Sequence, residues 1–158
     1  MTDYRDLLAK LQHEEDTIQF TAFTNEMAIK LGTRLAQAAR EASLSVTVDV
    51  CRNGQQLFHC ALPGTSGDND EWIKRKNRVV NRFGHSSYFV GITLKSQDAT
   101  MESKHLLDPH EYAAHGGAFP IIVKDIGVIG TVTVSGLPQE DDHRLVVRVL
   151  REFLKLPE

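Results

Sequence analysis

Apolar residues recur every three or four positions in four segments of the chain, a spacing that predicts amphipathic helices. In the second segment the apolar face is narrow and rich in alanine, which suits close packing on a sheet. The third begins with a predicted capping box, in which Asp68 caps the helix and Glu71 follows three residues later. The last follows Pro138, and its first acidic residues suit the helix dipole. The predicted helices span residues 3–15, 25–42, 68–83 and 138–154.

Two further stretches are rich in β-branched and alternating apolar residues on either side of a turn, as expected of β-hairpins. In the first hairpin, strands at 44–50 and 55–62 flank Asn53-Gly54, a pair that suits the positive φ angles of a type I′ turn. In the second hairpin, strands at 119–123 and 128–135 flank a turn at 124–127. Gly127 and Gly130 lie within this hairpin, so they indicate a bulge or close packing across the sheet rather than a dinucleotide site.

The remaining segments are less regular. Residues 88–94 suit a strand by alternation and a helix by length, so both remain open. Residues 96–118 are predicted to form a long loop with at most one helical turn, and loops of this length often carry function. Two hairpins surrounded by helices predict an α+β fold with one antiparallel sheet flanked by helices. The length of 158 residues predicts a single domain spanning 1–158.

Composition excludes some classes of function. The net charge of -3 argues against a nucleic-acid-binding protein, which usually has a strong basic excess. No segment approaches the roughly 20 apolar residues of a membrane span, and residues 1–16 lack the apolar core of a secretory signal. We therefore expect a cytoplasmic protein without membrane association. Cys51 and Cys60 lie on neighbouring predicted strands, and a reducing compartment favours free thiols there over a disulfide.

The second hairpin resembles a known family. Residues 116–120 read GGAFP, residues 127–138 read GVIGTVTVSGLP, and Asp141 and Asp142 follow at the start of the last helix. This pattern is similar to the haem-degrading-domain family, which includes GlcG, HbpS and the C-terminal domain of PduO. Earlier segments resemble a narrower, uncharacterised branch of that family: Phe20-x-x-Phe23, Leu31-Gly32, residues 67–76 and Ser86-Ser87.

The resemblance implies a profilin-like or PAS-like sheet, assembly into homodimers or larger rings, and a link to haem or to small-molecule metabolism. Haem iron needs an axial ligand, an apolar slot and cationic partners for the propionates. His115 is the candidate metal ligand, because Gly116 and Gly117 beside it would let a flat ligand approach the backbone. Any haem would be bound non-covalently, since the chain lacks a C-x-x-C-H motif. The candidate propionate partners are Arg75, Lys76 and Arg78.

Three functions are compatible with these residues. The first is a small-molecule-binding or haem-binding protein with weak haem-degrading activity. The second is a non-enzymatic oligomeric scaffold that recruits a protein partner, and the third is an enzyme acting on a small metabolite. We favour binding over catalysis because no acid–base pair is apparent. We expect His115, Gly117 and Arg75 to converge on one pocket near a subunit boundary.

The other histidines and acidic residues have simpler interpretations. His59 is predicted to be structural, His85 to end a helix, and His105 and His110 to be solvated. His110-Glu111 does not form an H-E-x-x-H zinc motif with the next histidine. Asp141, Asp142 and His143 are interpreted as residues placed at a helix start by the helix dipole.

Overall fold

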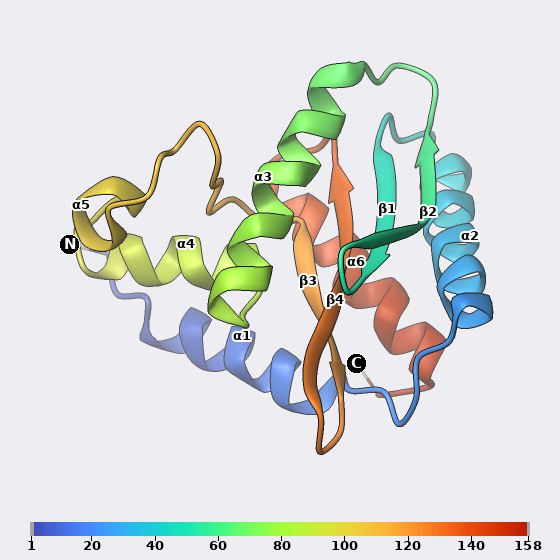
Figure 1. Cartoon of the computed structure of the whole chain (residues 1–158), viewed down its shortest axis with the longest axis horizontal. Coiled ribbons are helices and arrows are strands. Elements are labelled where there is room, and N and C mark those ends of the chain that lie inside the picture. The colour runs from blue at the N-terminus through green and yellow to red at the C-terminus, as the bar shows by residue number, and fades with distance from the viewer. Residues whose placement is uncertain (1, 158) are drawn as a thin grey trace.

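The computed structural model describes residues 2–157 and contains a four-stranded antiparallel sheet with helices on both faces (Figure 1). This confirms the predicted α+β fold. The strands lie in the order β2-β1-β4-β3, so both hairpins pair internally and the first strand of one pairs with the second strand of the other. The strands are β1 (Thr47–Arg52), β2 (Gln55–Ala61), β3 (Ala118–Val123) and β4 (Gly127–Ser135).

The helices cover the sheet unequally. Helix α3 lies across one face, over β4 and β3, while α2 and α6 cover the other face (Figure 1). Helices α1 and α4 pack together beside the β3 edge, where Phe20 also forms an isolated bridge with Val123. The helices are α1 (Arg5–Thr17), α2 (Asn25–Glu41), α3 (Gly67–Phe83), α4 (Ser87–Ser96), α5 (Met101–His105) and α6 (Gln139–Leu154).

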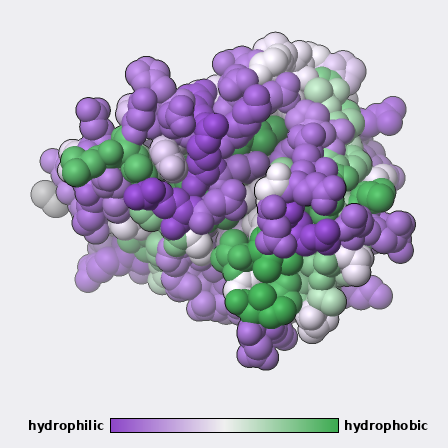
Figure 2. All heavy atoms as spheres, viewed as in Figure 1, coloured by the Kyte–Doolittle hydropathy of each residue, from purple (hydrophilic) through white to green (hydrophobic). Residues whose placement is uncertain are grey.

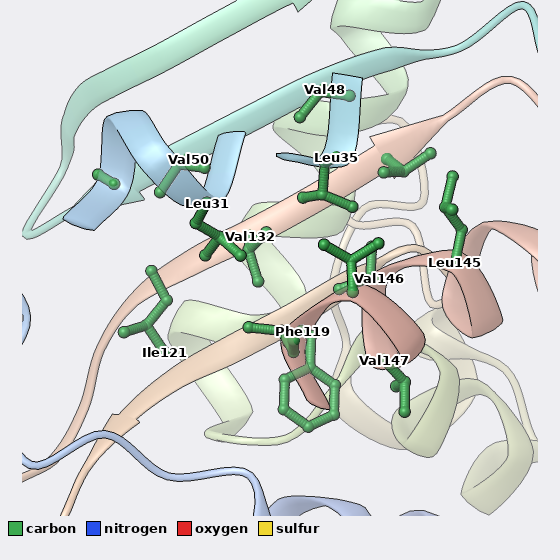
Figure 3. Close-up of a cluster of buried hydrophobic side chains, with 14 of the residues drawn as sticks. Leu31, Leu35, Val48, Val50, Phe119, Ile121, Val132, Leu145, Val146 and Val147 are labelled. Atoms are coloured by element: carbon green, nitrogen blue, oxygen red, sulfur yellow. The ribbon is translucent and has the colours of Figure 1, made fainter. Parts of the chain in front are cut away.

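The main hydrophobic core lies between the sheet and helices α2 and α6 (Figure 3). Side chains of alternate strand residues point into it, because successive side chains of a strand face opposite sides of the sheet. Phe119 of β3, Val132 of β4 and Leu31 of α2 are each at most 1% exposed. This packing explains the narrow alanine-rich face of α2, where Gly32 leaves room for the ring of Phe58.

The opposite face of the sheet is polar although it is buried beneath α3. Thr47, Asp49, Thr131 and Thr133 are each at most 1% exposed. Asn77 of α3 connects this layer, since its amide donates to Asp49 and its carbonyl oxygen accepts from the Thr133 hydroxyl. Helix α3 is therefore held to the sheet partly by hydrogen bonds. The surface on this side is mainly hydrophilic, with an apolar patch over the lower half of the β3–β4 hairpin (Figure 2).

Turn and strand glycines behave as the sequence predicts. Asn53 and Gly54 have positive φ angles of 50° and 81°, as a type I′ turn requires. A Cβ atom at Gly130 would collide with the backbone of Cys51 and Arg52 on the neighbouring strand. Gly130 therefore permits close approach of β4 to β1, which is one of the two roles predicted for it.

Several local predictions were wrong or incomplete. Ser66 caps α3 and forms the capping box with Asn69, so the box begins two residues earlier than predicted. Residues 88–94 belong to helix α4 because they pack on α1 and α3 rather than joining the sheet. Strand β1 begins at Thr47, three residues after its predicted start. By contrast, both cysteines are free thiols, as predicted. Among residues 2–157 we find no helix long and apolar enough to cross a membrane.

Candidate functional site

A cleft of about 310 Å³ opens where the first turns of α3 face the connection between β4 and α6. A larger groove of about 760 Å³ runs between α2 and β2, but its lining contains no histidine or lysine. We take the smaller cleft as the candidate site because His115 and Lys76, two of the residues predicted from the sequence, line it. Its lining comes from three separate parts of the chain: Asp68, Asn69, Trp72, Lys76, His115, Ser135, Gly136, Leu137, Gln139 and Asp142.

Helix geometry explains the contribution of α3. Asp68, Trp72 and Lys76 are spaced by four residues, so they share one face of the helix. His115 reaches the same cleft from the segment before β3, and the Ala113 amide fixes that segment to α3 by donating to the Arg75 carbonyl at 3.1 Å. The cleft thus depends on one helix face and one anchored loop.

Gly116 and Gly117 allow neighbouring segments of the protein to pack closely against their backbone. The Gly116 amide donates to the side-chain oxygen of Gln139 at 2.9 Å, and a Cβ atom there would collide with the Gln139 backbone. Gly117 has a φ angle of 137°, and a Cβ atom there would lie 2.6 Å from the Lys76 ammonium nitrogen. The space beside both glycines is therefore filled by α6 and Lys76, and no room for a flat ligand remains against their backbone.

Lys76 and Asp142 form a buried ion pair at the base of the cleft, with a distance of 3.1 Å between Nζ and Oδ2. Lys76 also donates to the Val134 carbonyl, and Asp142 accepts from the Gly136 and Leu137 amides. Burial lowers the pKa of Lys76 and raises the pKa of Asp142, while their mutual attraction opposes both shifts. Most of the hydrogen-bonding capacity of Lys76 and Asp142 is thus used by groups of the protein itself.

His115 is exposed to solvent overall, but its ring packs edge-on against Trp72, with 5.3 Å between ring centres. Burial lowers its pKa, and the positive charges of Lys76, Lys95 and Arg75 lower it further. No hydrogen bond among residues 2–157 involves this ring, so a neutral imidazole with one basic nitrogen is available to a ligand. Within the same residues no group of three or more His, Cys, Asp or Glu side chains could hold a metal ion.

The two arginines predicted to join the site lie differently. The Arg75 guanidinium lies 4.1 Å from the centre of the Trp72 ring, which lines the cleft, but Arg75 itself is not one of the lining residues. Arg78 instead contacts Glu111, donating to its carbonyl at 3.2 Å with its carboxylate 3.9 Å away. Of the predicted residues, His115 and Lys76 therefore line the cleft, and Arg75 lies beside it on Trp72. The two glycines lie behind the cleft, and Arg78 contacts Glu111 instead.

Sequence reasoning missed two important members of this site. Trp72 lies in the helix predicted at 68–83 and received no functional role, yet it lines the cleft and contacts both Arg75 and His115. Asp142 was interpreted as a helix-dipole residue, but it is 1% exposed and paired with Lys76. The position of Asp142 shortly after Ser135-Gly136, at a strand–helix connection, was a signal in the sequence. Its partner Lys76, however, is 66 residues away.

The other histidines have structural partners. His59 lies between Asp49 and Asp70, as its structural interpretation predicted. His85 follows the end of α3 as predicted, and its ring pairs with Glu15 of α1 at 2.7 Å. His143 is buried and contacts Glu14 at 2.8 Å, so the dipole interpretation was incomplete. His105 packs against the Phe83 ring and is half-buried rather than solvated. His110 is exposed, as expected.

Comparisons with known proteins agree on one family. The model for the family described as "Haem degrading protein HbpS-like" matches residues 23–151. The UPF0303 protein SCO2848 of Streptomyces coelicolor is 52% identical over 147 residues, which cover 93% of each chain. A UPF0303 protein of Serratia proteamaculans is 43% identical over 151 residues, covering 96% of this chain and 94% of the relative.

Solved structures share the fold. The crystal structure of the Ybr137w protein superposes with a TM-score of 0.88 at 37% identity, covering 94% of this chain and 88% of that one. The crystal structure of a PduOC:Heme complex has a TM-score of 0.68 at 16% identity and covers 86% of this chain and 97% of that one. HbpS itself has a TM-score of 0.66 at 22% identity, covering 86% of this chain and 92% of that one. The last two likenesses concern the fold alone.

Proposed function

We propose that this chain, which belongs to the HbpS-like family of haem-degrading proteins, binds a small molecule in the cleft between α3 and α6. The observation that carries this proposal is the surroundings of His115. A solvent-accessible imidazole without a hydrogen-bond partner among residues 2–157 lies against a tryptophan, in a concave site with several polar groups. An aromatic wall with a few convergent polar groups is the usual composition of a small-molecule site.

Binding is favoured over catalysis because the titratable groups of the cleft are occupied with one another. Lys76 and Asp142 are paired with each other and with backbone groups, so neither is free to exchange a proton with a substrate. Within the described residues, no acidic side chain is hydrogen-bonded to the His115 ring to orient it as a general base. We infer a binding protein that assembles as a homo-oligomer, with the cleft near a subunit boundary.

Haem is the ligand that the family name and the PduOC:Heme neighbour suggest. His115 suits an axial ligand because its imidazole is neutral, and Arg75 suits a propionate. Lys76 and Arg78 do not suit propionates, since both already have carboxylate partners. Ligand sites usually measure about 300–1,000 Å³, so a cleft of about 310 Å³ lies at the lower limit. One chain therefore does not enclose a haem, and a haem site would need a second copy to complete it.

A haemin titration tests whether haem is the ligand. Wild-type protein would be compared with His115→Ala and with His110→Ala, a matched control in an exposed part of the same loop. A saturable Soret shift that is lost in His115→Ala and kept in His110→Ala would support haem ligation by His115. An equal, unsaturated response in all three proteins would exclude haem from this site.

The proposal that the cleft binds a small molecule can be tested separately by tryptophan fluorescence, because Trp72 is the only tryptophan of the chain and lines the cleft. Intrinsic fluorescence therefore reports on the cleft directly. A small-molecule library would be screened for saturable changes in this fluorescence, with binding verified by calorimetry. If neither haemin nor any library compound gave a saturable change, the proposal that this cleft binds small molecules would be wrong.

A further inference from the structure

We infer, building on the binding function proposed above, that the ligand is a small carboxylate with a flat apolar body. Its anionic group would lie at the end of the cleft formed by Arg75 and His115, and its body would lie along Trp72. The charges, the walls and the size of the cleft each support this assignment.

The cation that would bind the carboxylate is Arg75. Its guanidinium stacks over Trp72, and its Nε donates weakly to the Glu71 carbonyl at 3.4 Å. Within residues 2–157 it forms no ion pair with a carboxylate, whereas Arg78, on the same helix, is within 4 Å of Glu111. Guanidinium groups bind carboxylates with two parallel hydrogen bonds when their terminal nitrogens are free. Arg75 is thus a cation on the Trp72 wall of the cleft, without an anionic partner among residues 2–157.

Acidic groups define the orientation. Asp142 lies at the base of the cleft but is already matched by Lys76 and by two backbone amides. Asp68 is exposed, seven residues before Arg75 on the same helix, which places the two positions about 10 Å apart along the axis. A ligand carboxylate would be repelled near Asp68 and attracted near Arg75, so its anionic end faces Arg75 and His115.

The walls suit an apolar body with polar edges. Trp72 and the half-buried Leu137 supply apolar surface on opposite sides of the lining, from α3 and from the β4–α6 connection. Gln139 accepts the Gly116 amide through its side-chain oxygen, which leaves its amide NH₂ as a donor at the cleft. A flat ring can lie against an aromatic wall over a larger area than a branched chain can.

The volume of the cleft favours a small ligand of this kind over a macrocycle such as haem. At about 310 Å³ the cleft is at the lower limit of sites that enclose drug-sized ligands. A one-ring carboxylate fits within that volume without a second copy of the chain. The inference therefore predicts that an isolated subunit binds its ligand, whereas haem would require an oligomer.

Benzoate and benzamide are the matched probes, because they share ring and shape and differ in charge. Each would be titrated while tryptophan fluorescence is recorded, with calorimetry as an independent measurement. We expect wild-type protein to bind benzoate at least 10-fold more tightly than benzamide. Arg75→Met should reduce benzoate affinity to that of benzamide and leave benzamide binding unchanged. Arg78→Met removes the same charge from the same helix away from the cleft, and should change benzoate affinity less than two-fold.

The outcomes are distinct. Equal affinity for the two probes, or equal losses in Arg75→Met and Arg78→Met, would overturn the carboxylate assignment. No binding of benzoate, with saturable binding of haemin or of a neutral library compound at Trp72, would overturn it and leave the proposed binding function standing. No saturable response to any compound would overturn both. Loss of the benzoate preference in Arg75→Met alone would support the assignment.

Discussion

The hydrogen-bonded pair between Glu14 and His143 fastens α1 to α6, and its removal should be costly. The distance between Glu14 Oε1 and His143 Nε2 is 2.8 Å, and the two side chains are 5% and 4% exposed. The second ring nitrogen of His143, Nδ1, is buried without a hydrogen-bond partner among residues 2–157. The substitution Glu14→Leu would therefore leave both nitrogens of a buried imidazole unsatisfied.

The expected destabilisation follows from that burial. Removing one partner of a buried pair costs about 3–5 kcal/mol, because the other polar group stays buried without compensation. Domains of this kind are stable by about 5–15 kcal/mol in total. A loss of this size should lower Tm by roughly 6–20 °C in a chain of this length. Asp16→Leu, at an exposed position on the same helix, should change stability by less than about 0.5 kcal/mol.

A double-mutant cycle measured by urea denaturation tests the physical reasoning. Glu14→Leu, His143→Leu and the double variant would be compared at a constant m-value. If the cost comes from an orphaned partner, the double variant should be at least about 2 kcal/mol more stable than the sum of the single losses predicts. Strict additivity, or a loss below about 1 kcal/mol in Glu14→Leu, would refute the reasoning.

Three further predictions follow from local geometry. Gly130→Ala should destabilise the protein by about 1–3 kcal/mol, since a Cβ atom would collide with the neighbouring strand; Gly67→Ala, where the space is open, should be neutral or stabilising in the same thermal melt. The hydrogen bond that His85 donates to the Glu15 carboxylate raises the pKa of His85, so its stabilising contribution should be complete below pH 6.5 and disappear as pH rises through the raised pKa; urea midpoints between pH 6 and 9 should fall less in His85→Gln than in the wild-type protein. Burial raises the pKa of Cys51 to about 12, so in a Cys60→Ser background it should react with Ellman's reagent at pH 8 at least about 100-fold more slowly than free cysteine.

Sequence patterns predicted the elements well where one local rule was sufficient. Alternation and the Asn53-Gly54 pair located the first hairpin, and the helical spacing of apolar residues located α1, α2, α3 and α6 within a few residues. Residues 88–94 could not be assigned in this way, because a short apolar run is compatible with either structure. Their helix is decided by packing against α1 and α3, which no local pattern describes.

The candidate site was only partly accessible from the sequence. His115, Arg75 and Lys76 could be named because basic residues and a histidine beside glycines suggest ligand chemistry. Their different environments could not be predicted. Arg75 and Arg78 have the same charge on the same helix, but one faces Trp72 and the other faces Glu111.

By itself, the sequence determined the α+β class, the two hairpins and the family. These depend on local periodicity and on short motifs, which can be recognised directly in the order of the residues. Tertiary structure alone decided which polar residues are buried. Thr47, Thr131 and Thr133 alternate with apolar residues as a solvent-facing row would, yet α3 covers them. Lys76 and Asp142 meet at the C-terminal end of β4 although 66 residues separate them. Alternation states which side of a strand a residue occupies, but only packing determines what covers that side.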